Sequence, residues 1–372
     1  MAESDRKPLD VVVLTPLGEG GKGGIDRIMD YVRGEAARVA DPDLRLHFLT
    51  TRGAGPIWKA PFYTWRAMRD LRRLKAQGRA DIVHVNLSQK ASVARKYQLV
   101  RLCVRLGIPY VVHLHGSRFR QYWAGAKPAL RARIDYIFTH ATAAYLLGTV
   151  WRDFVADRLG TKAPLLKIVP NATPRFEGEK TSGDGVPMIL FLGAIGERKG
   201  TYDLIEALAR IPEGLPWRAV IGGNGAVEEA KARAAAAGLG EKAAFPGWVG
   251  PAEVEAYLRQ ADILTLPSYD ENLPMSVIEG MAAGLPVVTT PVGATEDIIT
   301  DDVTGILVQP GDVAALTAAF ARLLAEPQTR ARLGAAARAF HEEHLEIEGY
   351  VARLVGHWRA DAARAAAGKD AA

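Results

Sequence analysis

Short apolar runs alternate with helical patterns along this chain of 372 residues, and each half has glycine-rich turns between a run and the helix after it. Runs such as 9–15, 188–192 and 263–266 are mainly apolar, which is typical of parallel strands buried on both faces. Parallel strands need crossover connections, which helices supply. The pattern predicts an α/β fold with two doubly wound, Rossmann-like domains facing a cleft.

A polar, glycine-rich segment at 177–185 separates the two halves and is typical of a linker. We therefore expect an N-terminal Rossmann-like domain over 1–178 and a C-terminal one over 186–345. The last residues, 346–372, include an amphipathic pattern at 350–364, although Gly349 and Gly356 interrupt its regularity.

The composition excludes several classes of protein. The single cysteine, Cys103, excludes a disulfide framework and a thiolate zinc site. The polar start of the chain lacks a signal-peptide core, and no apolar run is long enough to span a bilayer, so we expect a cytoplasmic protein. The net charge of +5 suits an anionic partner, but no nucleic-acid module is recognisable, so no nucleic acid is expected.

The stretch 261–289 contains two glutamates, Glu271 and Glu279, with seven residues between them. It predicts a strand at 263–266, a loop, a short helix beginning near Pro274, and another strand. A helix N-terminus is a natural seat for a phosphate, and carboxylates accept hydrogen bonds from sugar hydroxyls. The stretch therefore suits a phosphorylated sugar. The alternative is a loop charge and a solvent-facing helix residue spaced by accident.

This stretch resembles the E-x7-E signature of the retaining GT-B glycosyltransferases of family 4 (glycosyl transferases group 1), and the resemblance runs from about residue 11 to 345. It implies that Glu271 meets the hydroxyls of the donor sugar, as a catalytic group, and that Glu279 holds the ribose of the nucleotide. It also implies a retaining transfer from a UDP- or GDP-linked sugar to an acceptor hydroxyl. The loop between the two carboxylates fits the family's usual donor loop: Asn272, Leu273, Pro274 and Met275.

A second glycine-rich turn follows the run 188–192 and carries Arg198 and Lys199 at the start of a helix, which suits a diphosphate. Lys199 stands at the family's lysine position, which implies a catalytic and donor-binding role. Ala194 departs from the family, which usually has arginine there. Either Arg198 supplies that charge or the protein binds its donor more weakly. The alternative for the whole turn is a solvated turn without a ligand-binding role.

Further donor and acceptor residues follow from the resemblance. Gly223 belongs to a strand-to-helix glycine turn, and the backbone at Trp248 and Val249 is expected to meet the nucleobase, with plain packing as the alternative for Trp248. His115, followed by Gly116, resembles the family's His-Gly element near the acceptor and is our candidate beside the reacting centre. The remaining candidates are loop residues at the acceptor or diphosphate: Gly23, Gly24 and Asn171.

The resemblance also implies that residues 346–372 cross back to the first domain as a helix. It implies no cofactor besides the sugar nucleotide and no metal, since cations and a helix N-terminus can stabilise the departing diphosphate. Nothing in the chain has metal-ligand spacing. The run His341-Glu342-Glu343-His344 is not H-E-x-x-H, and we expect it on an exposed helix face.

Two rival functions remain. Gly18, Gly20 and Gly23 satisfy G-x-G-x-x-G between a strand and a helix, which is the position of a dinucleotide fingerprint. A Rossmann NAD site wants an acidic residue at the end of the second strand, but this strand ends in Thr50, Thr51 and Arg52, which leaves an NADP-dependent oxidoreductase as one alternative. A non-catalytic sugar-nucleotide-binding protein, suggested by Ala194, is the other.

Residues 58–78 are basic with interleaved aromatics, a composition that favours an interfacial helix at a membrane. A second such stretch lies at 118–123. We therefore expect peripheral contact with the inner membrane face and a lipid-linked saccharide acceptor in polysaccharide or lipopolysaccharide biosynthesis. The alternative is a surface helix whose apolar face packs on the domain.

Overall fold

The computed structural model describes residues 7–21, 23–181 and 185–370, and its chain divides into two compact units. Unit 1 comprises the chain up to Asn171 together with Ile347–Ala372, and unit 2 comprises Ala172–Glu346. Each unit contains a parallel sheet of six strands in its described part, so the predicted pair of doubly wound α/β domains is confirmed.

The strands of unit 1 are β1 (Leu9–Thr15), β2 (Leu44–Thr50), β3 (Ile82–Leu87), β4 (Tyr110–Leu114), β5 (Ala143–Leu146) and β6 (Leu165–Ile168). They pair in the order β2-β1-β3-β4-β5-β6. Residues 11–14 of β1 have no exposed surface, as expected of a strand covered on both faces. The order reverses between β1 and β3, and ligands of open α/β sheets bind at such switch points, outside the carboxyl ends of the strands.

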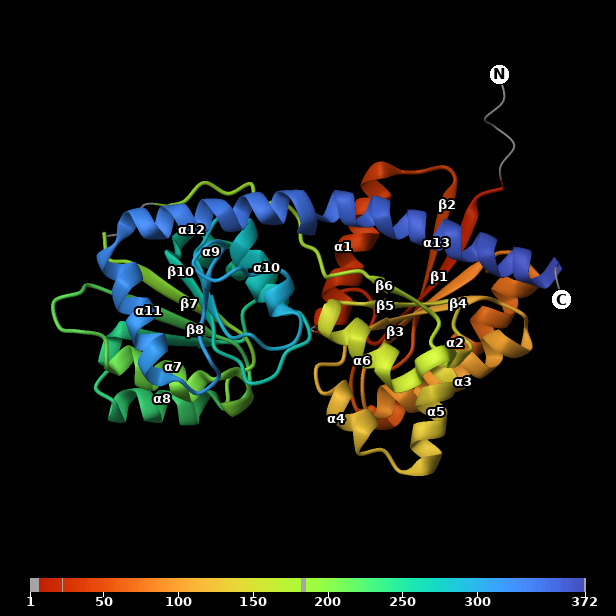
Figure 1. The fold of residues 1–372 in the computed structure, drawn as a ribbon, viewed down its shortest axis with the longest axis horizontal. Helices are drawn as coiled ribbons and strands as arrows, with labels where there is room; N and C mark the ends of the chain where they lie inside the picture. Colours follow the sequence, from red (N-terminus) through yellow and green to blue (C-terminus); the bar gives the residue numbers. More distant parts are fainter. Residues whose placement is uncertain (1–6, 22, 182–184, 371–372) are drawn as a thin grey trace, which may run out of the picture. The chain divides into compact units, whose positions relative to one another are not determined.

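The helices of unit 1 are α1 (Gly24–Val39), α2 (Ala60–Ala76), α3 (Ala91–Arg105), α4 (Phe119–Ala124), α5 (Pro128–Thr139), α6 (Thr149–Leu159) and α13 (Ile347–Asp370). Helix α13 lies beside α1 (Figure 1), where Glu348 and Arg359 form ion pairs with Arg38 and Asp41. It continues through Gly349 and Gly356, because the buried Trp358 and other apolar residues anchor it to the unit.

The strands of unit 2 are β7 (Met188–Leu192), β8 (Arg218–Gly222), β9 (Ala243–Gly247), β10 (Ile263–Leu266), β11 (Val287–Thr289) and β12 (Ile306–Leu307), in the order β12-β11-β10-β7-β8-β9. Its helices are α7 (Thr201–Ala209), α8 (Val227–Ala236), α9 (Pro251–Gln260), α10 (Met275–Ala282), α11 (Val313–Ala325) and α12 (Pro327–Phe340). Helices α7, α8 and α11 cover one face of the sheet, and α9, α10 and α12 cover the other (Figure 1).

The division between the units falls after Asn171, earlier than the linker expected from the sequence. The segment after it packs on unit 2: the Thr173 N–H donates to the Leu345 carbonyl (3.0 Å), and the Thr181 N–H donates to the Arg259 carbonyl (3.1 Å). Residues 172–181 therefore belong to unit 2 despite their polar composition. Part of the expected linker, Ser182, Gly183 and Asp184, lies outside the described residues.

The segment expected on an exposed helix face, 341–344, lies in a π-helical turn, His341–Leu345, where Glu342, Glu343 and His344 are exposed as expected but His341 is not. His341 has no exposed surface, and its Nε2 lies 2.8 Å from the Thr173 hydroxyl. That contact holds the start of unit 2 to its end, and it explains why the histidine turns inward.

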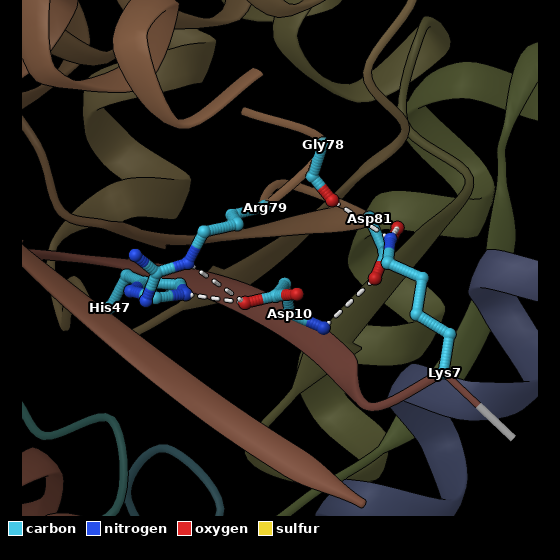
Figure 2. A network of polar contacts seen from close by, with 6 residues as sticks. All are labelled: Lys7, Asp10, His47, Gly78, Arg79 and Asp81. Atoms are coloured by element: carbon cyan, nitrogen blue, oxygen red, sulfur yellow. Dashed lines mark hydrogen bonds and ion pairs between the residues drawn. The ribbon is translucent and has the colours of Figure 1, made fainter. Parts of the chain in front are cut away.

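Polar residues at the amino edge of the first sheet tie its loops together (Figure 2). Asp10, fully buried in β1, contacts His47 Nε2 at 2.7 Å and Arg79 Nε at 3.8 Å, while its N–H donates to Asp81 (2.9 Å). Lys7 joins Asp81 to the Gly78 carbonyl. Because this network lies at the start of β1, away from the carboxyl ends where ligands bind, we interpret it as structural.

Candidate active site

The switch point of the second sheet lies between β7 and β10, which are paired neighbours. The loop after β7 leads into a short 3₁₀ helix, Glu197–Lys199, and the loop after β10 leads into α10. Because parallel strands end at one edge, these loops meet there. They carry the predicted donor residues Arg198, Lys199 and Glu271, and Glu279 lies in the second turn of α10.

Glu271 is held by both predicted cations. Its Oε1 accepts a hydrogen bond from Lys199 Nζ and lies 3.7 Å from a terminal nitrogen of Arg198. Glu271 is 8% exposed, so the pair is largely shielded from water. Arg198 also donates to the Asp270 carbonyl (2.8 Å), which fixes its guanidinium beside the loop. The cluster joins one carboxylate to two cations. When a ligand binds, the two cations can contact the ligand's oxygens in place of the carboxylate.

Two glycines allow the loops to approach so closely. Gly200 has a φ of +66°, and a Cβ there would lie 1.9 Å from the Pro267 carbonyl oxygen. Gly223 has a φ of +157°, and a Cβ there would lie 1.6 Å from the Gly193 carbonyl oxygen. Both values are far below van der Waals contact, so the backbones of these loops meet directly. Gly223 thus shapes the loop that follows β7.

The loop from Glu271 to Pro274 is buried, and Met275, the first residue of α10, is half-buried. The Ala294 N–H donates to the Asn272 carbonyl at 2.7 Å. Leu273 and Glu279 are 4% and 6% exposed. This burial argues against the alternative of two solvated charges, because carboxylates are almost never buried without a purpose or partners. Pro274 caps α10 and does not lie within it.

Trp248 and Val249 follow β9, the edge strand of the second sheet. The Val249 side chain lies against Gly222, where a Cβ would be 3.3 Å away. Trp248 is 47% exposed, so packing alone does not account for its indole. Ala194, the position that departs from the family pattern, is exposed and offers no charge, and Arg198 is the nearby guanidinium that contacts Glu271.

In unit 1, His115 follows β4 and is connected to α13 by hydrogen bonds. Trp358 Nε1 donates to His84 Nδ1 (3.0 Å), and Asn86 Oδ1 lies 3.3 Å from His84 Nε2 and 2.9 Å from His115 Nε2. Asn86 Nδ2 donates to the Leu14 carbonyl (3.3 Å), which orients the amide. The sequence alone gives no sign of the link between His84 and Trp358, because the contact joins residues distant in sequence.

These hydrogen bonds determine which tautomer His115 adopts. Burial, together with the neighbouring His113, lowers the pKa of both His84 and His115 well below the usual value, so both rings are neutral. An indole nitrogen only donates, so His84 Nδ1 is the acceptor and its Nε2 carries the proton. The Asn86 oxygen only accepts, so His115 Nε2 also carries its proton. His115 therefore presents Nδ1 as a hydrogen-bond acceptor.

Backbone N–H groups of the glycine loop after β1 already donate hydrogen bonds to carboxylates of the protein itself. Asp26 Oδ1 accepts from the N–H groups of Leu17 (2.9 Å) and Gly18 (3.1 Å), and Asp30 accepts from Gly20 (2.9 Å). A dinucleotide fingerprint needs such N–H groups for its pyrophosphate. The loop is therefore not a dinucleotide cradle, and the oxidoreductase alternative loses its only support. Burial, the largest influence, raises the pKa of Asp26.

The other predicted residues of this edge have simple positions. Gly23 caps α1 and Gly24 is its first residue, while Lys22, just before Gly23, lies outside the described residues. Asn171 is 5% exposed and ends unit 1 on the N-terminal side of the division. The structure groups His115 with Asn86 and His84, and it groups Lys199, Arg198 and Glu271 in unit 2.

Two family models match the chain. The model described as "Glycosyl transferase 4-like domain" matches residues 2–172, and the model described as "Glycosyl transferases group 1" matches residues 173–340. The two matches adjoin and together span nearly the whole chain. Their junction coincides with the division between the structural units.

Individual proteins are similar as well. A 2-deoxystreptamine glucosyltransferase of Streptomyces kanamyceticus is 26% identical over 312 residues, covering 78% of this chain and 79% of that one. A GDP-mannose-dependent alpha-(1-6)-phosphatidylinositol monomannoside mannosyltransferase of Mycolicibacterium smegmatis is 29% identical over 247 residues, covering 61% and 64%. The structure of Anabaena HepE in complex with UDP and glucose has a TM-score of 0.74 at 15% identity, covering 95% and 100%, and shows the fold.

Proposed function

We propose, from the premise that this chain belongs to the glycosyl transferases group 1 and has the GT-B fold, that it transfers a hexosyl group from a UDP- or GDP-linked sugar to an acceptor hydroxyl with retention of configuration. One observation carries the proposal: the nearly buried Glu271 is held by Lys199 and Arg198 at the switch point of unit 2. This arrangement offers cations to a diphosphate and a carboxylate to sugar hydroxyls.

The proposed chemistry balances without a cofactor. The acceptor oxygen bonds to the anomeric carbon, the bond from that carbon to the diphosphate oxygen breaks, and the hydroxyl proton passes to the diphosphate. Lys199, Arg198 and the N-terminus of α10 stabilise the negative charge that develops on the leaving group. This mechanism does not depend on a divalent cation, so activity should persist in EDTA.

The acceptor is assigned to unit 1. The lone pair on His115 Nδ1 suits an incoming hydroxyl, which it can orient as a neutral acceptor. The assignment of Gly23, Gly24 and Asn171 to the acceptor or the diphosphate remains part of the proposal. In the non-catalytic alternative, the protein would bind the nucleotide sugar but form no glycoside.

Donor binding is tested by thermal stabilisation with UDP and GDP, because a ligand of the native state raises the unfolding midpoint by mass action. We expect one of the two nucleotides to raise the midpoint, and Glu279→Gln to weaken that nucleotide's binding by about tenfold to a hundredfold, since a hydrogen bond to a charged group contributes about 1.5–3 kcal/mol. Glu228→Gln, an exposed position on α8, is the matched control.

Three outcomes would contradict this donor site: no stabilisation by either nucleotide, equal losses in Glu279→Gln and Glu228→Gln, or stabilisation by NADP alone. Once the donor is known, the anomeric configuration of the product, read by NMR, tests retention. A product of inverted configuration would refute the retaining mechanism while leaving the donor site intact.

A lipid-linked saccharide remains our proposed acceptor, and the surface of α2 supports it. Phe62 and Trp65 of α2 are 58% and 56% exposed, and their ring centroids lie 6.3 Å apart. Trp58, in the 3₁₀ turn Ile57–Lys59 just before α2, is 72% exposed, and we call these three aromatics the stripe. The opposite face packs on the unit through small and apolar residues. Exposed arginines flank the stripe, a pattern typical of helices that bind anionic bilayers.

Two further observations bear on membrane contact. The second aromatic stretch does not contribute, because Phe119 and Trp123 are fully buried in the core of unit 1, so that expectation was wrong. Within the described residues, no helix is both long and apolar enough to cross a bilayer. Contact through α2 would therefore be peripheral.

We predict that the triple variant Trp58→Ser/Phe62→Ser/Trp65→Ser binds vesicles containing anionic lipid at least about tenfold more weakly than the wild type, because burying one such side chain contributes about 1.5–3 kcal/mol. Vesicle co-sedimentation at low salt measures this. Val303→Ser, a comparably exposed apolar residue, is the control. If the wild type ignores anionic vesicles, the membrane proposal fails, and a soluble acceptor takes its place.

A further inference from the structure

A cluster of basic side chains surrounds the carboxyl ends of β1 and β2 in unit 1. Lys96 of α3 is 1% exposed, and its Nζ donates to the Leu14 carbonyl (3.2 Å) and the Thr51 hydroxyl (3.0 Å). Arg52 follows Thr51, and its N–H donates to the Pro16 carbonyl (2.8 Å). Arg95 precedes Lys96 on α3. These positions bring three basic side chains to one corner of the ligand-binding edge, and burial lowers the pKa of Lys96 well below its usual value.

The charges of this corner are not balanced. Among the described residues, neither the Arg52 nor the Arg95 guanidinium lies within ion-pair distance of a carboxylate, and the Nε atoms of both are buried without a hydrogen-bond partner. Burial and then the nearby Arg52 lower the pKa of Arg95. Asp26 is the carboxylate that acts on Lys96; its Oδ1 accepts two backbone N–H groups, and its Oδ2 is buried without a hydrogen-bond partner among the described residues.

Other arginines of the chain show what an ordinary structural role looks like. Arg233, Arg259 and Arg338 each pair with a glutamate one helical turn away, on exposed surfaces. A half-buried arginine pair without acceptors is different, because an unmet buried donor costs free energy. Groups held in an unfavourable arrangement at a ligand-binding edge are candidates for function.

We propose that Arg52 and Arg95 bind a phosphate group carried by the acceptor. This inference rests on the proposed function and narrows it, because it names a chemical feature of the acceptor. Two guanidiniums from different elements present donors from two directions, which a tetrahedral phosphate meets with several oxygens, whereas a planar carboxylate is satisfied by one fork. Lys96 ties Thr51, next to Arg52, to the end of β1.

The phosphate can come from a soluble phosphorylated acceptor or from the phosphate of a lipid carrier. Glycerol 3-phosphate is the probe for the first source, and dihexanoyl phosphatidic acid below its micelle concentration is the probe for the second. Glycerol is the uncharged control. All midpoints of thermal unfolding are measured at one ionic strength, adjusted with NaCl, so that general screening is constant.

We expect one or both phosphate probes to raise the midpoint in a saturable way. Arg52→Gln and Arg95→Gln should each weaken that binding by about tenfold to a hundredfold, since a charge-assisted hydrogen bond contributes about 1.5–3 kcal/mol. Without phosphate, each variant should unfold at the same or a higher temperature than the wild type, because the mutual repulsion is relieved. Arg105→Gln, exposed in the last turn of α3, should change nothing.

The source follows from which probe acts: a response to glycerol 3-phosphate indicates a soluble headgroup, and a response to the lipid analogue alone indicates a carrier lipid. The proposal is overturned if neither probe exceeds glycerol, or if Arg105→Gln loses as much as the other two variants. Titration with the nucleotide that stabilises the wild type distinguishes failure of the phosphate site from failure of the donor site. Arg52→Gln should bind that nucleotide as the wild type does. If every variant loses nucleotide binding, the proposed donor site has failed instead.

Discussion

Replacing Lys199 with methionine should lower kcat/KM by about a hundredfold to a thousandfold, the usual effect of removing one group that stabilises developing charge in a closed site. Lys199 is the cation in direct contact with Glu271, and its side chain is only 12% exposed. Methionine keeps the length and apolar stem of lysine and removes the charge. Steady-state kinetics with the identified sugar nucleotide measure the loss.

The same substitution leaves Glu271 nearly buried with Arg198, at 3.7 Å, as its remaining cation. We expect a loss of about 2 kcal/mol in the free energy of unfolding, below the 3–5 kcal/mol typical of a fully broken buried pair. The double variant Lys199→Met/Glu271→Gln removes both charges and should recover much of that stability while remaining inactive. If it recovers activity together with stability, Lys199 acts through folding alone and its catalytic role is wrong.

Acid should destabilise unit 1 steeply below pH 6.5. Burial lowers the pKa of His113 to about 3 and those of His84 and His115 well below the usual value. Above the unfolded pKa of about 6.5 these groups are neutral in both states and contribute no pH dependence. Below it the unfolded chain binds protons that the folded chain does not, so each histidine costs about 1.4 kcal/mol per pH unit.

By pH 5 the cost is about 2 kcal/mol for each of these histidines, a large part of a typical stability of about 5–15 kcal/mol. Urea unfolding at pH 7.5, 6.5 and 5.5 measures the slope. His113→Gln keeps a donor for the Val169 carbonyl and should reduce the slope by about 1.4 kcal/mol per pH unit. The exposed His140→Gln should leave the slope unchanged, and equal slopes in all three proteins would contradict the prediction.

Strands with continuous apolar sequence could be predicted closely. β1, β7 and β10 have the bounds expected from the chain, because burial on both faces leaves a run with few polar residues. β5 was missed: its sequence, Ala143–Leu146, is four residues long and has no β-branched side chain. It is a strand because it pairs with β4 and β6, an influence that local sequence does not contain.

In the candidate site, too, features of local sequence could be predicted and contacts made by the fold could not. The carboxylate spacing of Glu271 and Glu279 is local, so a motif reveals it. The partner of Glu271 is 72 residues away in sequence, and the two meet only because β7 and β10 are neighbours in the sheet. Lys96 gave a weaker signal: a lysine within an apolar helical pattern. The pairing of Arg52 with Arg95 gave none, because it depends on how the loop after β2 folds beside α3.

The hydrogen bonds from Trp358 to His115 have a direction. An indole has a hydrogen to give and no lone pair to offer, so Trp358 fixes the proton of His84. The Asn86 oxygen, oriented by the amide's own bond to the Leu14 carbonyl, fixes that of His115. Glutamine in place of Trp358 would present an oxygen as well as an N–H, so it would release the tautomer of His84 and leave that of His115 unchanged. The face that His115 presents is therefore decided by a single amide two residues along β3 from His84, and turning that one amide over would exchange donor for acceptor without moving an atom of the backbone.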